Sequence, residues 1–530
     1  MSYKWLKWTR VAIALVFFFS ISLIFLDFRD IVSENGVQAI TFLQFIPSLL
    51  KFITVLGLAG LGFIIILILT VLFGRVYCSS ICPLGILQDF ISRAGLKFKK
   101  KKRYRYRKAN NILRYSVLGI TLITGIFLSI LLVNLLDPYS AYGKVANQLF
   151  RPAGIWINNG IANILESINV YFLYKKDLYP LHLPSLLFAL LLLGVLIYMA
   201  GKHGRLYCNT ICPVGTFLGW LSRKSLFRIR MNKNNCTQCG KCAFACKAEC
   251  ISVKNMAVDN SRCVACYNCL TVCEDSAIDY SYKHKNADSA LELEKVRVNE
   301  GRKNFMITAL AGVVSVFSFK KLKATVPSDD TEPLNKKPTT IPEDRNYSVS
   351  PPGSTGINHF TDICTACQLC VSQCPTGVLQ PSFNQFGLSS IMQPHMDYYT
   401  NYCNYECVRC SEICPTGAIL PINVEEKKTL QLGKVQFIKE NCVVYTENTA
   451  CGSCSEHCPT QAVKMIPYKG SLTIPETDNS ICVGCGACEY ACPVVPYKAI
   501  YVDGNPIHQT AEKPEQEALE EPDMEEDFPF

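Results

Sequence analysis

Six groups of cysteines recur along this 530-residue chain with almost constant spacing. One group reads Cys236-x-x-Cys239-x-x-Cys242-x-x-x-Cys246, and every one of the 29 cysteines except Cys250 belongs to such a group or to a shorter paired motif. This spacing is typical of loops that bind cubane [4Fe–4S] clusters. Disulfide scaffolds are short and secreted, and their cysteines do not recur in this way. The cysteines are therefore predicted to be metal ligands, which limits much of the chain to small loop-rich modules.

Long apolar stretches add a membrane part to the same chain. Hydrophobic residues make up 49% of the sequence, and four stretches are apolar enough to cross a bilayer as helices. We expect these helices at residues 11–28, 52–73, 112–136 and 184–200. The first resembles a signal peptide, but no small-residue cleavage site follows it, so an uncleaved helix is predicted. Residues 37–50 are apolar but short and are expected to form an interfacial helix.

Basic residues gather beside these apolar stretches. Lys4, Lys7 and Arg10 precede the first, and residues 97–108 are dense in Lys and Arg. Loops of this kind are typical of the cytoplasmic side of a membrane. Binding of anionic lipid or RNA is the alternative for residues 97–108. Because much of the net charge of +10 lies here, that charge does not indicate a nucleic-acid-binding protein.

A motif repeats within the membrane part. Gly-Arg-x-Tyr-Cys-x-x-Ile-Cys-Pro-x-Gly occurs at residues 74–85 and again at 204–215. Because both copies run in the same direction, the repeat predicts a pseudo-twofold axis along the membrane normal. The expected fold class is a membrane α-helical bundle of four helices in two parallel repeats, with a fifth helix, plus α+β bacterial-ferredoxin-like dicluster domains.

The repeat carries four cysteines that this symmetry would bring together at one membrane face, namely Cys78, Cys82, Cys208 and Cys212. Three interpretations stay open for these predicted metal ligands. They jointly hold one further iron–sulfur centre, they act as redox-active thiols, or they bind copper(I), which suits soft thiolates.

The remaining groups predict six [4Fe–4S] clusters. In two-cluster ferredoxins the fourth cysteine of each run binds the cluster of the other run. In the first module this rule gives Cys236, Cys239, Cys242 and Cys273 for one cluster, and Cys263, Cys266, Cys269 and Cys246 for its neighbour. Lys247 and Glu274 stand where a Pro usually follows the fourth cysteine. Cys250 is expected to be a buried thiol.

The last module carries four runs, each followed by Pro. The same rule predicts Cys364, Cys367, Cys370 with Cys414; Cys403, Cys407, Cys410 with Cys374; Cys442, Cys451, Cys454 with Cys492; and Cys482, Cys485, Cys488 with Cys458. Zinc sites lack this fourfold interleaving, so zinc is not expected.

The domain organisation follows from these motifs. We expect a four-helix membrane domain at 1–225, a two-cluster ferredoxin domain at 226–285, a linker with a short fifth membrane segment at 286–325, a flexible linker at 326–356, a four-cluster ferredoxin-like domain at 357–502 and an acidic tail at 503–530. The apolar run 305–319 follows Arg302-Lys303 and resembles an internal twin-arginine export signal. A short anchor or an interfacial helix is the alternative for this run.

Nothing else in the sequence indicates an active site. Motifs for c-type haem, for a phosphate-binding Gly loop and for a nucleophile elbow are missing. Electrons must therefore be exchanged with another protein or with a compound dissolved in the membrane. Quinol is the natural candidate, and its oxidation needs polar groups at helix ends. Asp27, Asp137, Tyr139 and His182 are the predicted quinol-site residues, although Asp137-Pro138 would also serve simply as a helix cap.

These motifs resemble a known pair of subunits. Residues 1–282, with the repeated Gly-Arg-x-Tyr-Cys-x3-Cys-Pro motif and the dicluster module, resemble the membrane iron–sulfur subunit of the quinol dehydrogenase that serves periplasmic nitrate reductase. Residues 302–502 resemble its exported four-cluster ferredoxin-like subunit, so the chain is similar to a fusion of the two. Related accessory pairs occur with methylamine dehydrogenase, and the membrane part is also similar to a copper-oxidase assembly factor.

The resemblance implies a function. It implies a multi-pass protein of the bacterial inner membrane that oxidises menaquinol and relays electrons to an extracytoplasmic reductase or cytochrome. The first ferredoxin domain would be cytoplasmic and the second periplasmic. The alternative is a maturation factor that reduces a metal or cofactor of a partner enzyme.

Overall fold

The computed structural model describes residues 3–55, 57, 60–98, 104–178, 182–282 and 340–513. These residues belong to one compact unit. The predicted fifth membrane segment at 305–319 with its Arg302-Lys303 pair lies outside the described residues, as does most of the predicted acidic tail.

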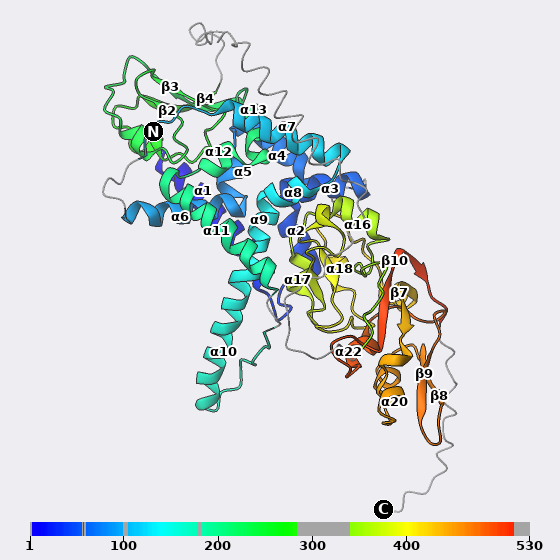
Figure 1. Ribbon diagram of the computed structural model, residues 1–530. Helices are drawn as coiled ribbons and strands as arrows, with labels where there is room; N and C mark the ends of the chain where they lie inside the picture. Colours follow the sequence, from blue (N-terminus) through cyan, green and yellow to red (C-terminus); the bar gives the residue numbers. More distant parts are fainter. Residues whose placement is uncertain are drawn as a thin grey trace, which may run out of the picture. The chain divides into compact units, whose positions relative to one another are not determined.

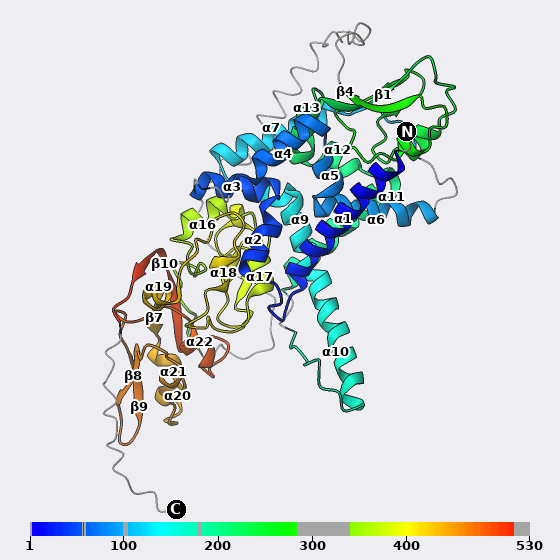
Figure 2. The ribbon, with the colours of Figure 1, turned by 180° about the vertical axis from the view of Figure 1, so that it is seen from behind.

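The N-terminal part is helical (Figure 1). Its helices are α1 Lys4–Leu26, α2 Glu34–Phe42, α3 Phe45–Val55, α4 Gly62–Phe73, α5 Val76–Ser80, α6 Pro83–Phe98, α7 Asn111–Phe127, α8 Leu131–Leu136, α9 Pro138–Val145, α10 Arg151–Ser167, α11 Leu183–His203, α12 Leu206–Thr210 and α13 Pro213–Ser222, with a π-helical turn η2 at Ala146–Phe150. Seen from behind, α1 lies against α5 and α6 (Figure 2). Helices α6 and α11 approach closely where Gly95 faces Gly201, because a Cβ on Gly95 would lie 2.9 Å from the Gly201 Cα.

Two helices of the described part, α1 and α11, are long and apolar enough to cross a membrane. The pair α2 and α3 would form a third crossing if it is counted as one broken span, and it bends by 110°. Helices α4 and α7 are apolar but shorter. The first and fourth predicted spans therefore match long helices, whereas the count of four spans stays a prediction.

The predicted continuous helix 52–73 is wrong, because the chain breaks between α3 and α4. Ser48 stabilises the break: its hydroxyl donates to the Gly60 carbonyl at 2.8 Å and accepts from the Phe63 amide at 2.9 Å. A Cβ on Gly62 would lie 1.9 Å from the Phe42 carbonyl oxygen. Gly60 and Gly62 thus permit a close approach of one backbone segment to another.

Two further predicted segments differ from the structure. The predicted helix 112–136 is interrupted after α7, where Thr124 bonds back to the carbonyls of Ile120 and Thr121 and α8 starts four residues later. Such back-bonding by threonine often bends helices. The predicted interfacial helix at 37–50 is instead divided between α2 and α3, which meet at a sharp bend.

The first ferredoxin-like module is a small α+β fold held by short strands. Strands β1 Phe227–Met231 and β4 Ile278–Tyr282 pair antiparallel, and so do β2 Ile251–Ser252 and β3 Ala257–Val258. The turns α14 Lys241–Ala245 and η3 Cys269–Thr271 carry the cysteine runs. Because the strands are so short, the module's buried interior consists largely of cysteines and their neighbours.

The last module repeats this design twice. Its helical turns are α16 Ile357–Ile363, α17 Leu369–Gln373, η5 Leu388–Ser390, α18 Arg409–Glu412, α19 Val424–Thr429, η6 Lys439–Asn441, α20 Val443–Thr446, α21 Ser453–Glu456 and α22 Ala487–Ala491. Its antiparallel strand pairs are β5 Leu379–Pro381 with β6 Pro394–Met396, β7 Leu430–Phe437 with β10 Ile500–Thr510, and β8 Val463–Pro467 with β9 Thr473–Thr477. The long β7–β10 ribbon (Figure 1) extends past the predicted domain end at residue 502.

Residues 340–356, predicted as the end of a flexible linker, pack on the last module. The Ile341 amide donates to the Asn441 side chain at 2.7 Å, and the Asn346 amide donates to Asp503 at 2.9 Å. Arg345 forms ion pairs with Glu343 and with the buried Glu489. The described part of the predicted linker is therefore part of the module.

A buried ion cluster joins the first module to the helical domain. The Asp89 carboxylate on α6 pairs with Arg205 at 2.7 Å and with Lys247 of the module, and Arg10 of α1 lies 3.6 Å away. Burial raises the pKa of a carboxyl, but here the charges of Arg205 and Lys247 outweigh it and lower the pKa of Asp89 below its ordinary value. The carboxylate is thus charged and shared by three elements.

Replacing Asp89 with Ala is expected to destabilise the protein by roughly 3–5 kcal/mol, because Arg205 and Lys247 would stay buried without their partner. The measurement is the thermal unfolding midpoint of the purified protein in detergent. E166A removes the solvent-facing pair between Glu166 and Lys175 and serves as the control, with no measurable change expected. An unchanged midpoint in D89A would show that the ion cluster does not hold the module in place.

Candidate iron–sulfur sites

The structure gathers the cysteines of the first module into two groups. Cys236, Cys239, Cys242 and Cys273 line one small cavity of about 20 Å³. In the second group, burial and the neighbouring thiols Cys266, Cys263 and Cys246 raise the pKa of Cys269 well above its ordinary value. Gln238 and Gly240 have positive φ angles and let the backbone curve around the first group.

The last module contains four groups of the same kind. One cavity is lined by Cys374, Cys403, Cys407 and Cys410, and another by Cys442, Cys451, Cys454 and Cys492. In the third group, burial and the thiols Cys367, Cys364 and Cys414 raise the pKa of Cys370. In the fourth group, burial and the thiols Cys485, Cys482 and Cys458 raise the pKa of Cys488.

These groups match the requirements of [4Fe–4S] clusters. Each joins three cysteines of one run to the fourth cysteine of another, as the spacing rule predicts. Four thiols around a small closed space are the donor set that such a cluster needs. Among the described residues, no group of three or more His, Cys, Asp or Glu side chains lies close enough together to hold a single metal ion. We therefore propose these six sets as cluster ligands.

Cys250 lies beside one of the proposed ligands. Its side chain is 1% exposed, as expected for a buried thiol, and its sulfur lies 3.5 Å from the sulfur of Cys246. The hydrogen bond from Cys250 lowers the pKa of Cys246 to about 7, whereas bonding to Cys246 and Cys263 raises the pKa of Cys250 well above its ordinary value. Cys246 is therefore the better thiolate ligand, and Cys250 keeps its proton.

The two Cys-x3-Cys-Pro motifs form a buried thiol site within the helical domain. All four cysteines are buried. The Gly85 amide donates to the Cys82 sulfur at 3.4 Å, and the Gly215 amide donates to the Cys212 sulfur at 3.3 Å. The Gln88 amide nitrogen lies 3.3 Å from the Cys208 sulfur. Hydrogen bonds of this kind stabilise thiolates and tune the potentials of any centre they hold.

The arginines of the two motifs bond across to each other's cysteine loops. Arg75 of the first motif donates to the Cys208 carbonyl at 3.1 Å, and Arg205 of the second donates to the Cys78 carbonyl at 2.6 Å. The motif glycines make room for this exchange. A Cβ on Gly85 would lie 2.6 Å from Arg205, and one on Gly215 would lie 3.0 Å from Arg75. The two motifs therefore fix each other's position.

The same arginines connect the thiol site to the first module. The Arg205 amide donates to the Lys247 carbonyl at 2.9 Å. Arg75 donates to the Ser261 carbonyl at 3.2 Å and to the Asn209 side chain, which in turn bonds the Ala248 carbonyl. The sequence repeat contained both arginines but gave no sign of this role, because the bonds join segments from 39 to 186 residues apart.

The four predicted quinol-site residues have separate structural surroundings. The Asp27 carboxylate accepts the amides of Arg29, Ile31 and Val32. Asp137 caps α9 by accepting the Ser140 amide at 2.8 Å, as the alternative interpretation of Asp137-Pro138 anticipated.

Tyr139 and His182 are placed differently. Tyr139 is fully buried, and within the described residues its hydroxyl has no hydrogen-bond partner. The His182 imidazole bonds Ser185 at 2.8 Å and lines a cavity of about 70 Å³ that also contains Arg151. The cavity beside His182 is not lined by Asp27, Asp137 or Tyr139, and the role of the four residues with quinol stays a prediction.

The last module contacts the C-terminal end of α1. The Gln373 side chain donates to the carbonyls of Ile24 and Asp27. Gly143 of α9 lies against the module as well, since a Cβ there would lie 2.2 Å from the Cys367 carbonyl oxygen. Toward the N-terminal end of α1, Arg10 donates to the Ser79 carbonyl at 3.1 Å. Arg10 also lies 3.6 Å from Asp89, which pairs with Lys247 of the first module.

Comparisons with known proteins agree with an iron–sulfur protein. A family model described as a 4Fe-4S binding domain matches residues 55–105 and 182–234, which contain both Cys-x3-Cys-Pro motifs. A model described as a 4Fe-4S dicluster domain matches residues 447–499. No solved structure matches the chain significantly.

Three relatives are informative. The chain is 28% identical to an uncharacterized protein of Methanocaldococcus jannaschii over 42% of the chain and 78% of that protein. It is 27% identical to the ferredoxin-type protein NapF of Escherichia coli K12 over 29% of the chain and 85% of NapF. It is 26% identical to the ferredoxin-type protein NapH of Haemophilus influenzae over 43% of the chain and 68% of NapH. The resemblance to ferredoxin-type proteins such as NapF and NapH is thereby confirmed, whereas the fusion is supported only in part.

Pairs of serine substitutions test the ligand sets. C442S and C492S together should remove one cluster, because both residues belong to the same set, so iron content falls by about four atoms per chain. C482S with C492S should remove two clusters and about eight iron atoms. Iron and sulfide analysis of anaerobically purified protein gives the count. The reverse order of losses would contradict the exchanged pairing.

Single substitutions at Cys246 and Cys250 test which of the two thiols is a ligand. C246A is expected to lose about four iron atoms per chain, whereas C250A should keep the full content because only a hydrogen bond disappears. The iron content and the low-temperature EPR spectrum of the reduced protein report both results. Equal losses in the two variants would make Cys250 a ligand.

Proposed function

We propose that this chain, a ferredoxin-type iron–sulfur electron-transfer protein related to NapH and NapF, oxidises menaquinol and delivers the electrons to an extracytoplasmic reductase. The six cysteine sets would hold [4Fe–4S] clusters, which supply one-electron stations with potentials tuned by the protein. The Cys-x3-Cys-Pro thiols would hold a further iron–sulfur centre. The match of a 4Fe-4S family model to both motifs favours this over the thiol and copper interpretations.

One observation carries the proposal: the first module is linked through Asp89 to Arg10 in the first half of α1, and the last module contacts the C-terminal end of α1. This helix has 23 residues and is therefore roughly 35 Å long, which suffices for the hydrocarbon core of a bilayer. Arg10 near its start lies by Ser79 and Asp89, next to the first module. Its last carbonyls accept from Gln373 of the last module. If α1 crosses the membrane, the modules lie on different sides.

The polar contacts place the thiol site between these modules. Arg75 and Arg205 bind carbonyls of the first module and of the cysteine loops at once. On the other side, Gly143 packs against the Cys367 carbonyl in the last module's first cysteine run. An electron that enters at the membrane thiols would therefore have one proposed cluster-binding module on the cytoplasmic side and another on the extracytoplasmic side.

Sidedness follows from the basic residues. Lys4, Lys7 and Arg10 at the start of α1 favour a cytoplasmic N-terminus. The first module would then be cytoplasmic and the last module extracytoplasmic, in a multi-pass inner-membrane protein with the helical repeats as two parallel halves. A terminal reductase of the nitrate reductase kind would accept the electrons from the last module.

Substituting the membrane thiols tests the function. Menaquinol analogue added anaerobically should bleach the visible absorption of the wild-type clusters, and C78S and C208S should slow this by at least roughly tenfold because the entry point for electrons is damaged. Reduction by dithionite is the control, since it bypasses the membrane site. If menaquinol reduces both variants as fast as the wild type while maturation of a partner enzyme is lost, the alternative role as a maturation factor is supported instead.

A further inference from the structure

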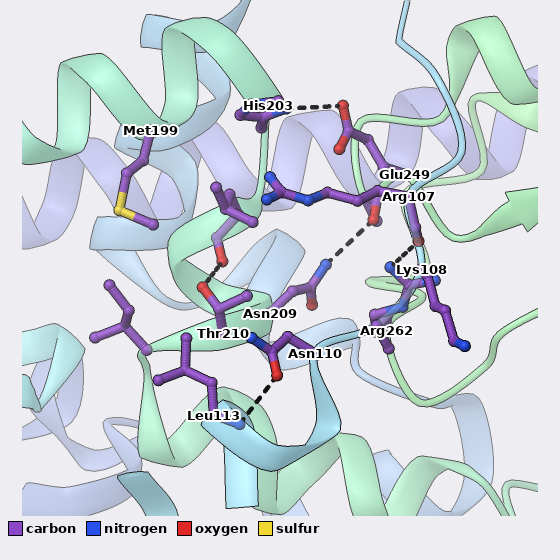
Figure 3. Close-up of a pocket in the computed structure, with 14 residues that line it drawn as sticks. Arg107, Lys108, Asn110, Leu113, Met199, His203, Asn209, Thr210, Glu249 and Arg262 are labelled. Carbon is purple, nitrogen blue, oxygen red and sulfur yellow. Dashed lines mark hydrogen bonds and ion pairs between the residues drawn. The ribbon is translucent and has the colours of Figure 1, made fainter. Parts of the chain in front are cut away.

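A cavity of about 180 Å³ lies between the membrane helices and the first module (Figure 3). Its walls come from the start of α7, the end of α11, the loop of the second Cys-x3-Cys-Pro motif and the segments around residues 248 and 262. This is smaller than the roughly 300 Å³ at which pockets for drug-sized molecules begin. It suits a ring system whose tail remains outside.

The cavity is accessible from the apolar surface of two helices. Leu113 on α7 and Met199 on α11 line it, together with Leu206 and Ile211. Leu113 is 42% exposed, and α11 is one of the two helices that are long and apolar enough to cross a membrane. A lipid-soluble molecule can therefore reach the cavity from the bilayer while its chain stays among the lipids.

Two polar groups provide specific contacts inside this apolar lining. His203 ends α11, and its Nδ1 lies 3.5 Å from the Glu249 carboxylate, so that within the described part of the chain Nε2 is the ring nitrogen not engaged by this pair (Figure 3). Arg262 is 5% exposed; its Nε binds Asp259 and its Nη1 binds the Arg107 carbonyl. Within the described residues, the buried Nη2 of Arg262 has no hydrogen-bond partner. A buried donor without a partner is costly, so a ligand oxygen is its natural complement.

The cavity adjoins two of the proposed redox groups. Asn209 lines it and directly follows Cys208. Ala248 lines it from the other side, two residues after Cys246. The Asn209 side chain bonds the Ala248 carbonyl at 3.3 Å and closes the wall between them. A molecule in the cavity therefore lies next to the membrane thiol site and to the first module at once.

We infer that this cavity binds the ring of the menaquinol, with His203 and Arg262 as the groups that contact its two oxygens. The inference rests on the proposed function and names its site. Oxidation breaks both O–H bonds of the quinol. One proton passes to His203 Nε2 and the other to water at the cavity mouth; iron–sulfur centres, which the neighbouring cysteines would hold, would accept the two electrons one at a time. Glu249 positions the imidazole.

The cavity is surrounded by charges of both signs. Arg262 already pairs with Asp259, and Glu249 adds a negative charge beside His203. With His203 neutral these four side chains carry a net charge of −1, and Arg107 and Lys108 of the lining bring the total to +1. A neutral ring with two oxygen atoms can occupy such a mixed lining.

Binding of a photoreactive short-chain menaquinone analogue tests the site on the full-length protein in detergent. The wild type should be labelled within 104–113 or 199–211. H203Q and the cavity-filling M199F should each weaken the Kd by at least roughly tenfold while iron content stays at the wild-type level. L191F is the matched control for M199F, because Leu191 is 67% exposed on the same helix, and it should bind as the wild type does. H182Q tests the alternative site at the opposite end of this helix.

The outcomes separate this site from the function. Unchanged binding in both H203Q and M199F, or labelling near His182 with loss of binding in H182Q, overturns the site while quinol oxidation still stands. If H203Q loses iron, its weaker binding could result from damage to the protein, and the binding of M199F alone then tests the site. If the wild type neither binds the analogue nor is bleached by menaquinol, the proposed function fails first, and this inference fails with it.

Discussion

The exchange of two arginines between the Cys-x3-Cys-Pro motifs is the interaction on which the rest of the structure depends. Arg75 and Arg205 are both fully or almost fully buried, and each binds a carbonyl of the other's cysteine loop. A buried guanidinium needs partners for its charge, so separating these loops would remove hydrogen bonds from two buried cations. The same side chains bind the first module. One pair of residues thus fixes the thiol site, the order of the helices around it and the adjacent ferredoxin-like fold.

The modules depend on a different constraint. Their strands are two to eleven residues long, and their buried interiors are built around cysteines. Such small units cannot bury enough apolar surface to be stable without additional links. Clusters that take ligands from two runs provide those links, since each cluster ties together segments that are distant in sequence. The strap at 340–356 adds polar contacts along the outside of the last module.

The polar residues at the ends of the helices have two kinds of role. Asp27 and Asp137 accept backbone amides where helices end or begin, which gives each carboxylate a structural role. His203 and Arg262 line one cavity, and within the described residues the buried Nη2 of Arg262 has no hydrogen-bond partner. Position at a helix end is therefore a weak guide to function, whereas the hydrogen bonds that a side chain still lacks are a strong one.

The sequence alone determined the metal chemistry, because cluster ligation depends on short cysteine spacings that are covalently fixed and on a rule for exchanging the fourth ligand. It also identified the repeated Gly-Arg-x-Tyr-Cys motif and the apolar runs at α1 and α11. Only the tertiary structure decided the rest. The break between α3 and α4 depends on Ser48, the use of Arg75 and Arg205 depends on the opposite repeat, and the cavity at His203 depends on residues from four separate segments. Each of these depends on which distant segments pack together. Spacing along the chain does not specify which segments pack together, because burial and hydrogen-bond partners in three dimensions decide the packing.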